Sequence, residues 1–569
     1  FISSLVGFVT SQLIRSEKIL AIDGYLWALL GIISVTQVFR LNTLLPEEGF
    51  PWQLVAGGAL SWMIILGSLV SWRDQTLLFL SLPALAASGA VSPFDVGSRS
   101  QLFVDKVLVD AADNVAFTLH PARPHPENPI LKADQPWEGW RVEIYGNVIY
   151  DEQEQLFKMW YYAEEREGFP RLGLYYATSQ DGVHWDKPLI GEVKSAKHPR
   201  HNVIAEGILL PSVMKDVHDP DPARRYKMIG HNQDAQDHGY HTWVSPDGIH
   251  WTRFSESRIA PGADVVTGYY DEQRGCYVAF PKIAHTVRGF ERRVFWLTTS
   301  PDFRTWSEPQ LVFTPDLRDD AGSLARIEEV RPVLDVPDEP ALMRTEFYGI
   351  GAYPAESCTL AFIWMFTINN NARYGNQEGP GELQLAASRD LVHWERPFRQ
   401  PCVPRGKVGE WDCGFFGTQA RALRVGDEVW LYYGGSNYTH GTPCLYRAEG
   451  TGRGTQYTGS LGLAIWDLDR FVSVDAPAEG GSLTTVPLAF AGGRMEVNAR
   501  VTGALTVTLC DAAGTPYPGF EASDAIQGDN LRHAVAWGGQ ADVSSLRGKP
   551  VVVRFALRDA ELFAFAFRE

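Results

Sequence analysis

One short pattern recurs along the middle of the chain and limits the folds that this chain can adopt. The copies read SQDGVHW, SPDGIHW, SPDFRTW and SRDLVHW, beginning at residues 179, 245, 300 and 388, and a degenerate fifth, WDLDRFV, begins at residue 466. Two runs rich in β-branched and aromatic residues precede each copy, as is typical of strands. Units of this kind, each read as a four-stranded antiparallel sheet, predict an all-β fold with a five-bladed β-propeller over residues 100–478.

The repeated serine, aspartate and tryptophan are interpreted as structural residues. An aspartate in a tight turn bonds to its own backbone, and a tryptophan fills the space between blades. A residue that recurs in every blade cannot mark the one place where chemistry occurs. The catalytic residues therefore have to be sought elsewhere.

The first ninety residues are strongly apolar. Four apolar stretches, at residues 1–14, 25–39, 52–72 and 76–91, are separated by short charged breaks, and the third is close to the ~20 residues that a membrane-spanning helix needs. We expect residues 1–92 to form an α-helical membrane segment, with a buried helical bundle as the alternative. Arg15, Lys18 and Arg73, placed on the inner side, put the rest of the chain outside. If residues 73–90 are a signal peptide, the rest is secreted instead.

Charge and length narrow the remaining possibilities. With 569 residues the chain is expected to hold two or three domains, and its net charge of −17 argues against nucleic acid as a partner. The six cysteines form no pair or array with zinc-ligand spacing, so neither a metal nor another cofactor is expected. Short alternating strands and glycine-rich turns over residues 480–569 predict a C-terminal β-sandwich.

The motif SRDLVHWE resembles the strand-turn-strand motif of glycoside hydrolase families 32, 43 and 130, which are five-bladed propellers. The run from FVDKVLVD, near Phe103, to WDLDRFVSV is similar to a family-32-like group of bacterial proteins. The resemblance implies a glycoside hydrolase that acts on an oligo- or polysaccharide through carboxylates at the propeller axis. Combined with the apolar N-terminal stretches, this predicts an exported enzyme that is tethered to the membrane by the N-terminal helices.

Carboxylates recur at one register of the strands expected to line the axis. Counting back from the hairpin turns VIYDEQ, GYYDEQ and GAYPAE reaches Glu143, Asp264 and Glu346. Glycoside hydrolysis typically uses two carboxyl groups, one as acid and one as base or nucleophile. By the resemblance, Glu143 takes the base or nucleophile position, Asp264 is the middle acid and Glu346 is the proton donor. Each of the three could equally be a strand-end residue or an ion-pair partner.

Four more residues are candidates for substrate binding. Trp137 and Trp140 precede the first axial strand and could stack on a sugar or pack the propeller's closure. Asp412 in blade five and the loop residue His440 could contact substrate. As a further acid for the axis, blade two offers Asp216 or Asp219.

The chain departs from the families' patterns. It has no WMNDPN-type opening, no Arg-Asp-Pro triplet and no Glu-Cys pair, and a glutamate replaces the first aspartate. A non-catalytic glycan-binding propeller therefore remains an alternative, and a family-130-like phosphorylase a less favoured one.

Overall fold

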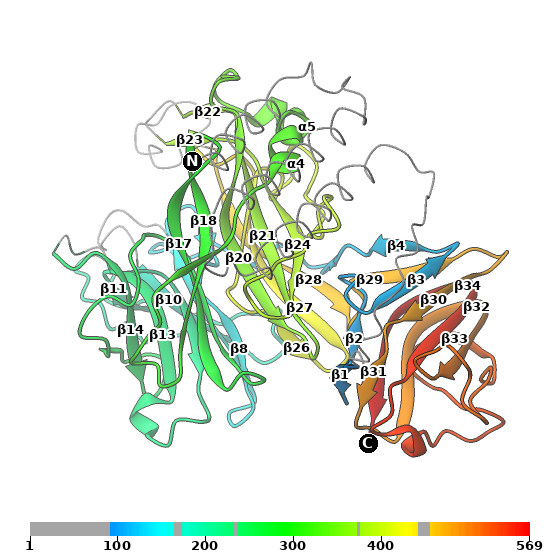
Figure 1. The fold of residues 1–569 in the computed structure, drawn as a ribbon. Helices are drawn as coiled ribbons and strands as arrows, with labels where there is room; N and C mark the ends of the chain where they lie inside the picture. The colour runs from blue at the N-terminus through cyan, green and yellow to red at the C-terminus, as the bar shows by residue number, and fades with distance from the viewer. Residues whose placement is uncertain (1–91, 164–172, 233, 235, 373–375, 442–455) are drawn as a thin grey trace, which may run out of the picture. The chain divides into compact units, whose positions relative to one another are not determined.

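The computed structural model describes residues 92–163, 173–232, 234, 236–372, 376–441 and 456–569, which are almost entirely β-structure (Figure 1). The helical elements in these ranges are short: α4 (Leu317–Ala321), α5 (Ser323–Glu329) and the 3-10 turns η2 (Pro222–Arg224), η3 (Arg331–Val333) and η6 (Ser544–Leu546). The expected membrane segment lies outside the described residues, apart from its final position. Across the described ranges, no helix has the length and apolar character needed to cross a bilayer.

Five antiparallel sheets follow one another along the chain and form the predicted five-bladed propeller. Blade one contains β7 (Val142–Glu143), β8 (Val148–Asp151), β9 (Leu156–Ala163), β10 (Gly173–Ser179) and β11 (Val203–Glu206). Blade two contains β12 (Ile208–Lys215), β13 (Tyr226–Asn232), β14 (Gly239–Ser245) and β15 (Thr252–Arg253). Blade three contains β16 (Val266–Asp271), β17 (Cys276–Val287), β18 (Phe290–Ser300) and β19 (Gln310–Phe313).

Blade four contains β20 (Arg344–Pro354), β21 (Thr359–Ile368) and β24 (Gly381–Ser388), with the ribbon β22 (Asn370–Asn371) and β23 (Gln377–Glu378) beyond them. Blade five contains β25 (Phe415–Thr418), β26 (Leu423–Val425), β27 (Glu428–Ser436) and β28 (Gly459–Asp467). Its outer edge comes from much earlier in the chain, because β5 (Arg123–Pro124) and β6 (Leu131–Lys132) pair with β28.

The expectation of four strands in every blade is met only in blades two and three. In blade one the first strand is divided into β7 and β8, both paired with β9. The division lies at Gly146, where a side chain would meet the carbonyl oxygen of Trp160. In blade four the fourth strand is reduced to isolated bridges, Leu383 with Val403 and Ala387 with Glu395.

Hydrogen bonds join the inner strands of neighbouring blades into a closed ring, which fixes how the blades are placed around the axis. The contacts, blade by blade, are Val213 N to Asn147 Oδ1 (2.8 Å), Ser212 Oγ to Val266 O (2.7 Å), Thr267 Oγ1 to Ile350 O, Ala352 N to Ala420 O (2.8 Å) and Ala420 N to Gly146 O (3.1 Å). Polar groups near the axis are thereby satisfied, as burial requires.

The structural interpretation of the repeat is confirmed. In each of the four full copies the aspartate accepts hydrogen bonds from the backbone N–H groups two and three residues later, as Asp390 does from Val392 and His393 (2.8 and 2.7 Å). The tryptophan packs between blades: the Trp394 ring lies 5.8 Å from that of Phe280 in blade three.

The C-terminal strands enclose a separate apolar core, centred on residues such as Leu505, Phe555 and Phe565. They are β29 (Val472–Ala476), β30 (Gly481–Thr485), β31 (Leu488–Phe490), β32 (Arg494–Cys510), β33 (Ile526–Ala534) and β34 (Val552–Arg568). Four strands that precede the propeller join them: β1 (Phe94–Gly97), β2 (Gln101–Leu102), β3 (Val109–Asp113) and β4 (Ala116–Leu119). Both ends of the described chain therefore build this β-domain (Figure 1).

Candidate active site at the propeller axis

Charged and aromatic side chains gather around the N-terminal ends of the inner strands of blades three and four. We call Asp264, Lys282, Arg293, Glu346, Tyr348 and His440 the axial cluster. Asp264 lies just before β16, and Glu346 and Tyr348 lie near the beginning of β20. Lys282 and Arg293 come from the neighbouring strands β17 and β18. Strands of two blades thus bring two of the three predicted acids into one cluster.

Asp264 is the most accessible carboxylate of the axial cluster. Its side chain is 30% exposed and forms an ion pair with the ammonium group of Lys282. Its backbone N–H donates to Nδ1 of His231 (3.2 Å), and its φ of 77° lies in the left-handed region that few residues other than glycine adopt. Burial alone raises the pKa of Asp264, but Lys282, the Tyr348 hydroxyl and Arg293 outweigh it and lower that pKa. Asp264 is therefore ionised at neutral pH.

Tyr348 connects the parts of the cluster. The Lys282 ammonium lies 4.1 Å from the centre of the Tyr348 ring and the Arg293 guanidinium 5.1 Å from it, both cation–π distances. The ring also stacks on Trp364, 6.3 Å between centroids. Burial, and then the charge of Asp264, raise the pKa of Tyr348 well above its usual value. The phenol therefore keeps its proton and donates it in a hydrogen bond to Asp264.

Glu346 is enclosed by arginines. Its carboxylate is buried, at 1% exposure, and Oε2 accepts from Arg293 Nη1 (2.5 Å) and from the Arg293 backbone N–H (3.2 Å). The other oxygen, Oε1, accepts from Arg344 Nε (2.8 Å). Both oxygens are thus engaged by cations. Each carboxylate of the cluster is thus paired with a cation, Asp264 with Lys282 and Glu346 with Arg293.

His440 packs its ring against Phe366, Phe415 and Tyr348, with centroids 4.7, 5.3 and 5.2 Å away. Burial and then the charge of Arg293 lower the pKa of His440 to about 3, so its ring is neutral in ordinary conditions. Nδ1 lies 2.8 Å from the carbonyl oxygen of Gln377 and must donate to it. Nε2 is then left as an acceptor for a hydroxyl group.

Glu143 and Trp140 lie together in blade one. Arg141 Nη1 bonds to Glu143 Oε1 (2.9 Å), and the Arg141 guanidinium lies 5.1 Å from the Trp140 ring, which meets the Tyr457 ring edge-on at 5.5 Å. The charge of Glu143 also contributes to the raised pKa of Tyr348. Glu143 is therefore electrostatically coupled to the axial cluster from the opposite blade.

The remaining candidates lie apart from the axial cluster. The Trp137 indole N–H donates to Asn202 Oδ1 (2.7 Å), and the ring packs within blade one. Of the two predicted roles of Trp137, this arrangement fits packing rather than stacking on a sugar. Asp412 accepts from the Tyr433 hydroxyl (3.1 Å) within blade five, and burial raises the pKa of Asp412. Asp216 and Asp219 lie at the other end of β12, where both form ion pairs with Lys227.

Lys282, Arg293 and His231 were not among the predicted site residues. Lys282 follows the apolar run CYVAFP and is only 7% exposed. A buried cation within an apolar strand needs a partner, so the sequence around Lys282 could have indicated a charged site. The three predicted acids lie on or just before the first strands of their blades, whereas these residues come from second and third strands.

Among known proteins, this chain matches solved structures only. No protein-family model and no curated protein match the chain. An N-acetylgalactosamine deacetylase from F. plautii is 12% identical, with a TM-score of 0.35, over 67% of this chain and 95% of that chain. A glycosyl hydrolase from Bacteroides ovatus is 12% identical (TM-score 0.37; 62% and 94%). A β-1,2-mannobiose phosphorylase from Listeria innocua is 14% identical (TM-score 0.37; 61% and 97%). At these identities no activity is assigned to this chain.

Proposed function

We propose that this chain is a carbohydrate-active propeller protein that hydrolyses a glycosidic bond at the axial cluster. The observation that carries the proposal is Asp264, an ionised and partly exposed carboxylate beside a protonated phenol and a neutral imidazole. Such a carboxylate suits a base, a nucleophile or a group that stabilises positive charge on the sugar ring. Tyr348 and His440 supply hydrogen-bonding groups for sugar hydroxyls.

The proton donor is proposed to be Glu346, with Glu143 as the second candidate. Glu346 can serve only when substrate binding draws Arg293 or Arg344 away from one carboxylate oxygen, because both oxygens are engaged. Glu143 contacts Arg141, and 14% of its side chain is exposed. Trp140, above the same arginine, would then contact the sugar.

A non-catalytic glycan-binding propeller is the second candidate function. It is favoured by the enclosure of Glu346, because both of its carboxylate oxygens already accept hydrogen bonds from arginines. Phosphorolysis ranks below both. Lys282, Arg293 and Arg344 converge and could attract phosphate, but each is already paired with a carboxylate.

The deciding experiment measures reducing ends released from soluble polysaccharides by the full chain, with and without inorganic phosphate. Asp264→Asn keeps the shape of the side chain and removes its charge, so the rate should fall by roughly a hundredfold or more. Glu272→Gln, an exposed carboxylate beyond the other end of β16 that pairs with His218, is the matched control and should leave the rate unchanged. If wild type releases reducing ends and Asp264→Asn releases them at the same rate, the axial cluster is not the catalytic site. Release that requires phosphate would indicate phosphorolysis.

A further inference from the structure

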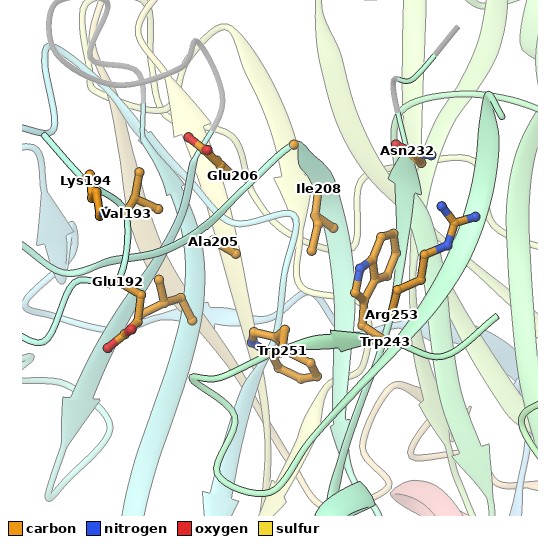
Figure 2. Close-up of a pocket in the computed structure, with 12 residues that line it drawn as sticks. Glu192, Val193, Lys194, Ala205, Glu206, Ile208, Asn232, Trp243, Trp251 and Arg253 are labelled. Carbon is orange, nitrogen blue, oxygen red and sulfur yellow. The ribbon is translucent and has the colours of Figure 1, made fainter. Parts of the chain in front are cut away.

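A concave site lies between blades one and two, apart from the axial cluster. It is a cavity of about 650 Å³ with one wall from β11 and the loop before it, and the other from β12, β13 and β14 and the adjoining β15. Figure 2 shows Glu192, Val193 and Lys194 on one side and Asn232, Trp243 and Arg253 on the other, with Trp251 low between them. We call the surface formed by Glu192, Glu206, Asn232, Trp243, Trp251 and Arg253 the interblade groove.

Trp251, which lines this groove, has an unused hydrogen-bond donor. Its Nε1 is buried and has no hydrogen-bond partner among the described residues. At the same repeat position in blades three and four, Trp306 and Trp394 donate to the carbonyl oxygen three residues earlier (3.1 and 3.0 Å). In blade two that oxygen belongs to Gly248, and it accepts from the Trp160 indole of blade one (2.7 Å) instead.

The Trp160 indole of blade one thus takes the carbonyl oxygen that the Trp251 N–H would otherwise bond, and the Trp251 N–H is left without an acceptor. A buried N–H without a partner is uncommon in folded proteins and marks a place where a ligand or water can bind. Trp185 has the same unpaired nitrogen in blade one, because the Tyr432 hydroxyl takes the Gly182 carbonyl oxygen, but Trp185 does not line the groove. The combination of a free donor and a cavity is found at Trp251.

The chemistry of the groove fits sugar rings. Trp243 and Trp251 provide apolar indole surface, onto which the C–H face of a sugar can pack, and the Trp251 N–H can donate to a hydroxyl. Glu206 is exposed at the rim and can accept from hydroxyls, while Arg253 is held in place by the Ser255 carbonyl oxygen (3.0 Å). The lining carries Glu192 and Glu206 against Lys194 and Arg253, and Arg253 is also paired with Asp237. The groove therefore has no excess of positive charge, which disfavours an anion and suits a neutral polyhydroxyl ligand.

The groove opens at the same end of the propeller as the axial cluster. Consecutive residues of a strand face opposite sides of the sheet. At the end of β13, His231 contacts Asp264 on the side of blade three, and the next residue, Asn232, lines the groove on the side of blade one. Blade two alone separates the two sites.

We propose that the interblade groove binds sugar units of a neutral polysaccharide whose more distant units reach the axial cluster. This inference rests on the proposed carbohydrate function. It makes the substrate an extended chain and assigns to Trp251 and Glu206 the binding of units away from the reacting bond.

The test is native gel electrophoresis of the full chain through gels that contain arabinan, xylan, mannan or galactan. At least one polymer should retard the wild type. Trp251→Phe keeps an aromatic ring but removes the N–H, and should weaken retardation roughly tenfold, the effect of one lost hydrogen bond. Glu206→Ala, at an exposed rim position, should weaken it in the same direction. Trp306→Phe, the same change in blade three, is the control and should behave as wild type.

Asp264→Asn separates this inference from the proposed function, because it removes the axial charge and leaves the groove intact. Retardation that depends on Trp251 or Glu206 supports the groove even if no polymer is cleaved. The groove is rejected if none of the four polymers retards the wild type. It is also rejected if Trp251→Phe and Glu206→Ala both bind as wild type, whether or not cleavage is observed.

Discussion

Lys282 forms its ion pair with Asp264 while its ammonium group lies over the Tyr348 ring. One cation thus fixes the position of the accessible carboxylate and keeps it ionised. The same lysine is flanked by Arg293, so positive charge surrounds Asp264 on the protein side. The open side of this carboxylate is where a developing positive charge on a sugar ring would be stabilised.

Replacing Lys282 should change the pH dependence of catalysis. In Lys282→Met the pKa of Asp264 rises, since its main stabilising charge is gone. The acid limb of kcat/KM, where the rate falls as Asp264 becomes protonated, should therefore move to higher pH by roughly one to three units. The measurement is a pH–rate profile beside that of Lys132→Met, an exposed lysine on β6. An unmoved acid limb would show that Asp264 does not control it.

Glu346→Gln tests the proton donor. If Glu346 is the acid, substrates with poor leaving groups should lose about a hundredfold or more, and activated aryl glycosides, which need little protonation, should lose much less. Equal losses on both substrate types would show that Glu346 serves to hold Arg293 and Arg344. In that case Glu143→Gln should show the dependence on the leaving group, and Asp412→Asn is the comparison in blade five.

His440 should make the fold less stable in acid. Its pKa is about 3 in the folded protein, below the usual value near 6.5, so the unfolded chain takes up the proton more readily. The neutral His440 ring makes its full contribution to the free energy of unfolding above pH 6.5. This contribution is lost as the pH falls from 6.5 towards 3. Between pH 7 and pH 5 the loss is up to roughly 2 kcal/mol.

His440→Phe keeps an aromatic ring beside Phe366 and cannot be protonated. Its melting temperature should therefore change less between pH 7 and pH 5 than that of wild type. His393→Phe, at an exposed histidine of the repeat in blade four, is the matched control. If the melting temperature of His440→Phe fell as much between pH 7 and pH 5 as that of wild type, His440 would not be the source of the acid sensitivity.

Placement of the propeller outside the cell follows from the apolar residues 1–92 and remains a prediction. Protease added to intact cells that produce the full chain should digest the propeller, and a cytoplasmic marker protein should survive. Protection of the propeller until the cells are lysed would overturn the proposed topology.

The blades were predictable from the sequence because their signal is local. The turn aspartates and the tryptophan recur with each sheet, and the alternation within single strands is visible without any neighbour. The division of the first strand at Gly146 was not visible, because it depends on the approach of the Trp160 carbonyl oxygen from another strand.

The site was predicted only in part for the same physical reason. Asp264 and Glu346 were found by counting along first strands. The Lys282 and Arg293 contacts depend on how strands of two blades are staggered, which no local pattern encodes. Trp137 and Trp140 are three residues apart, yet one packs in blade one beside Asn202 and the other lies against Arg141.

The pairing of β5 and β6 with β28 has a consequence for synthesis of the chain. The ribosome completes residues 123–132 long before it reaches residues 459–467, their partners in blade five. Until then these early strands expose unpaired backbone groups, and blade five has no outer edge. Closure is therefore a late, non-local event, and a nascent propeller of this kind depends on protection from aggregation until nearly all of it has emerged.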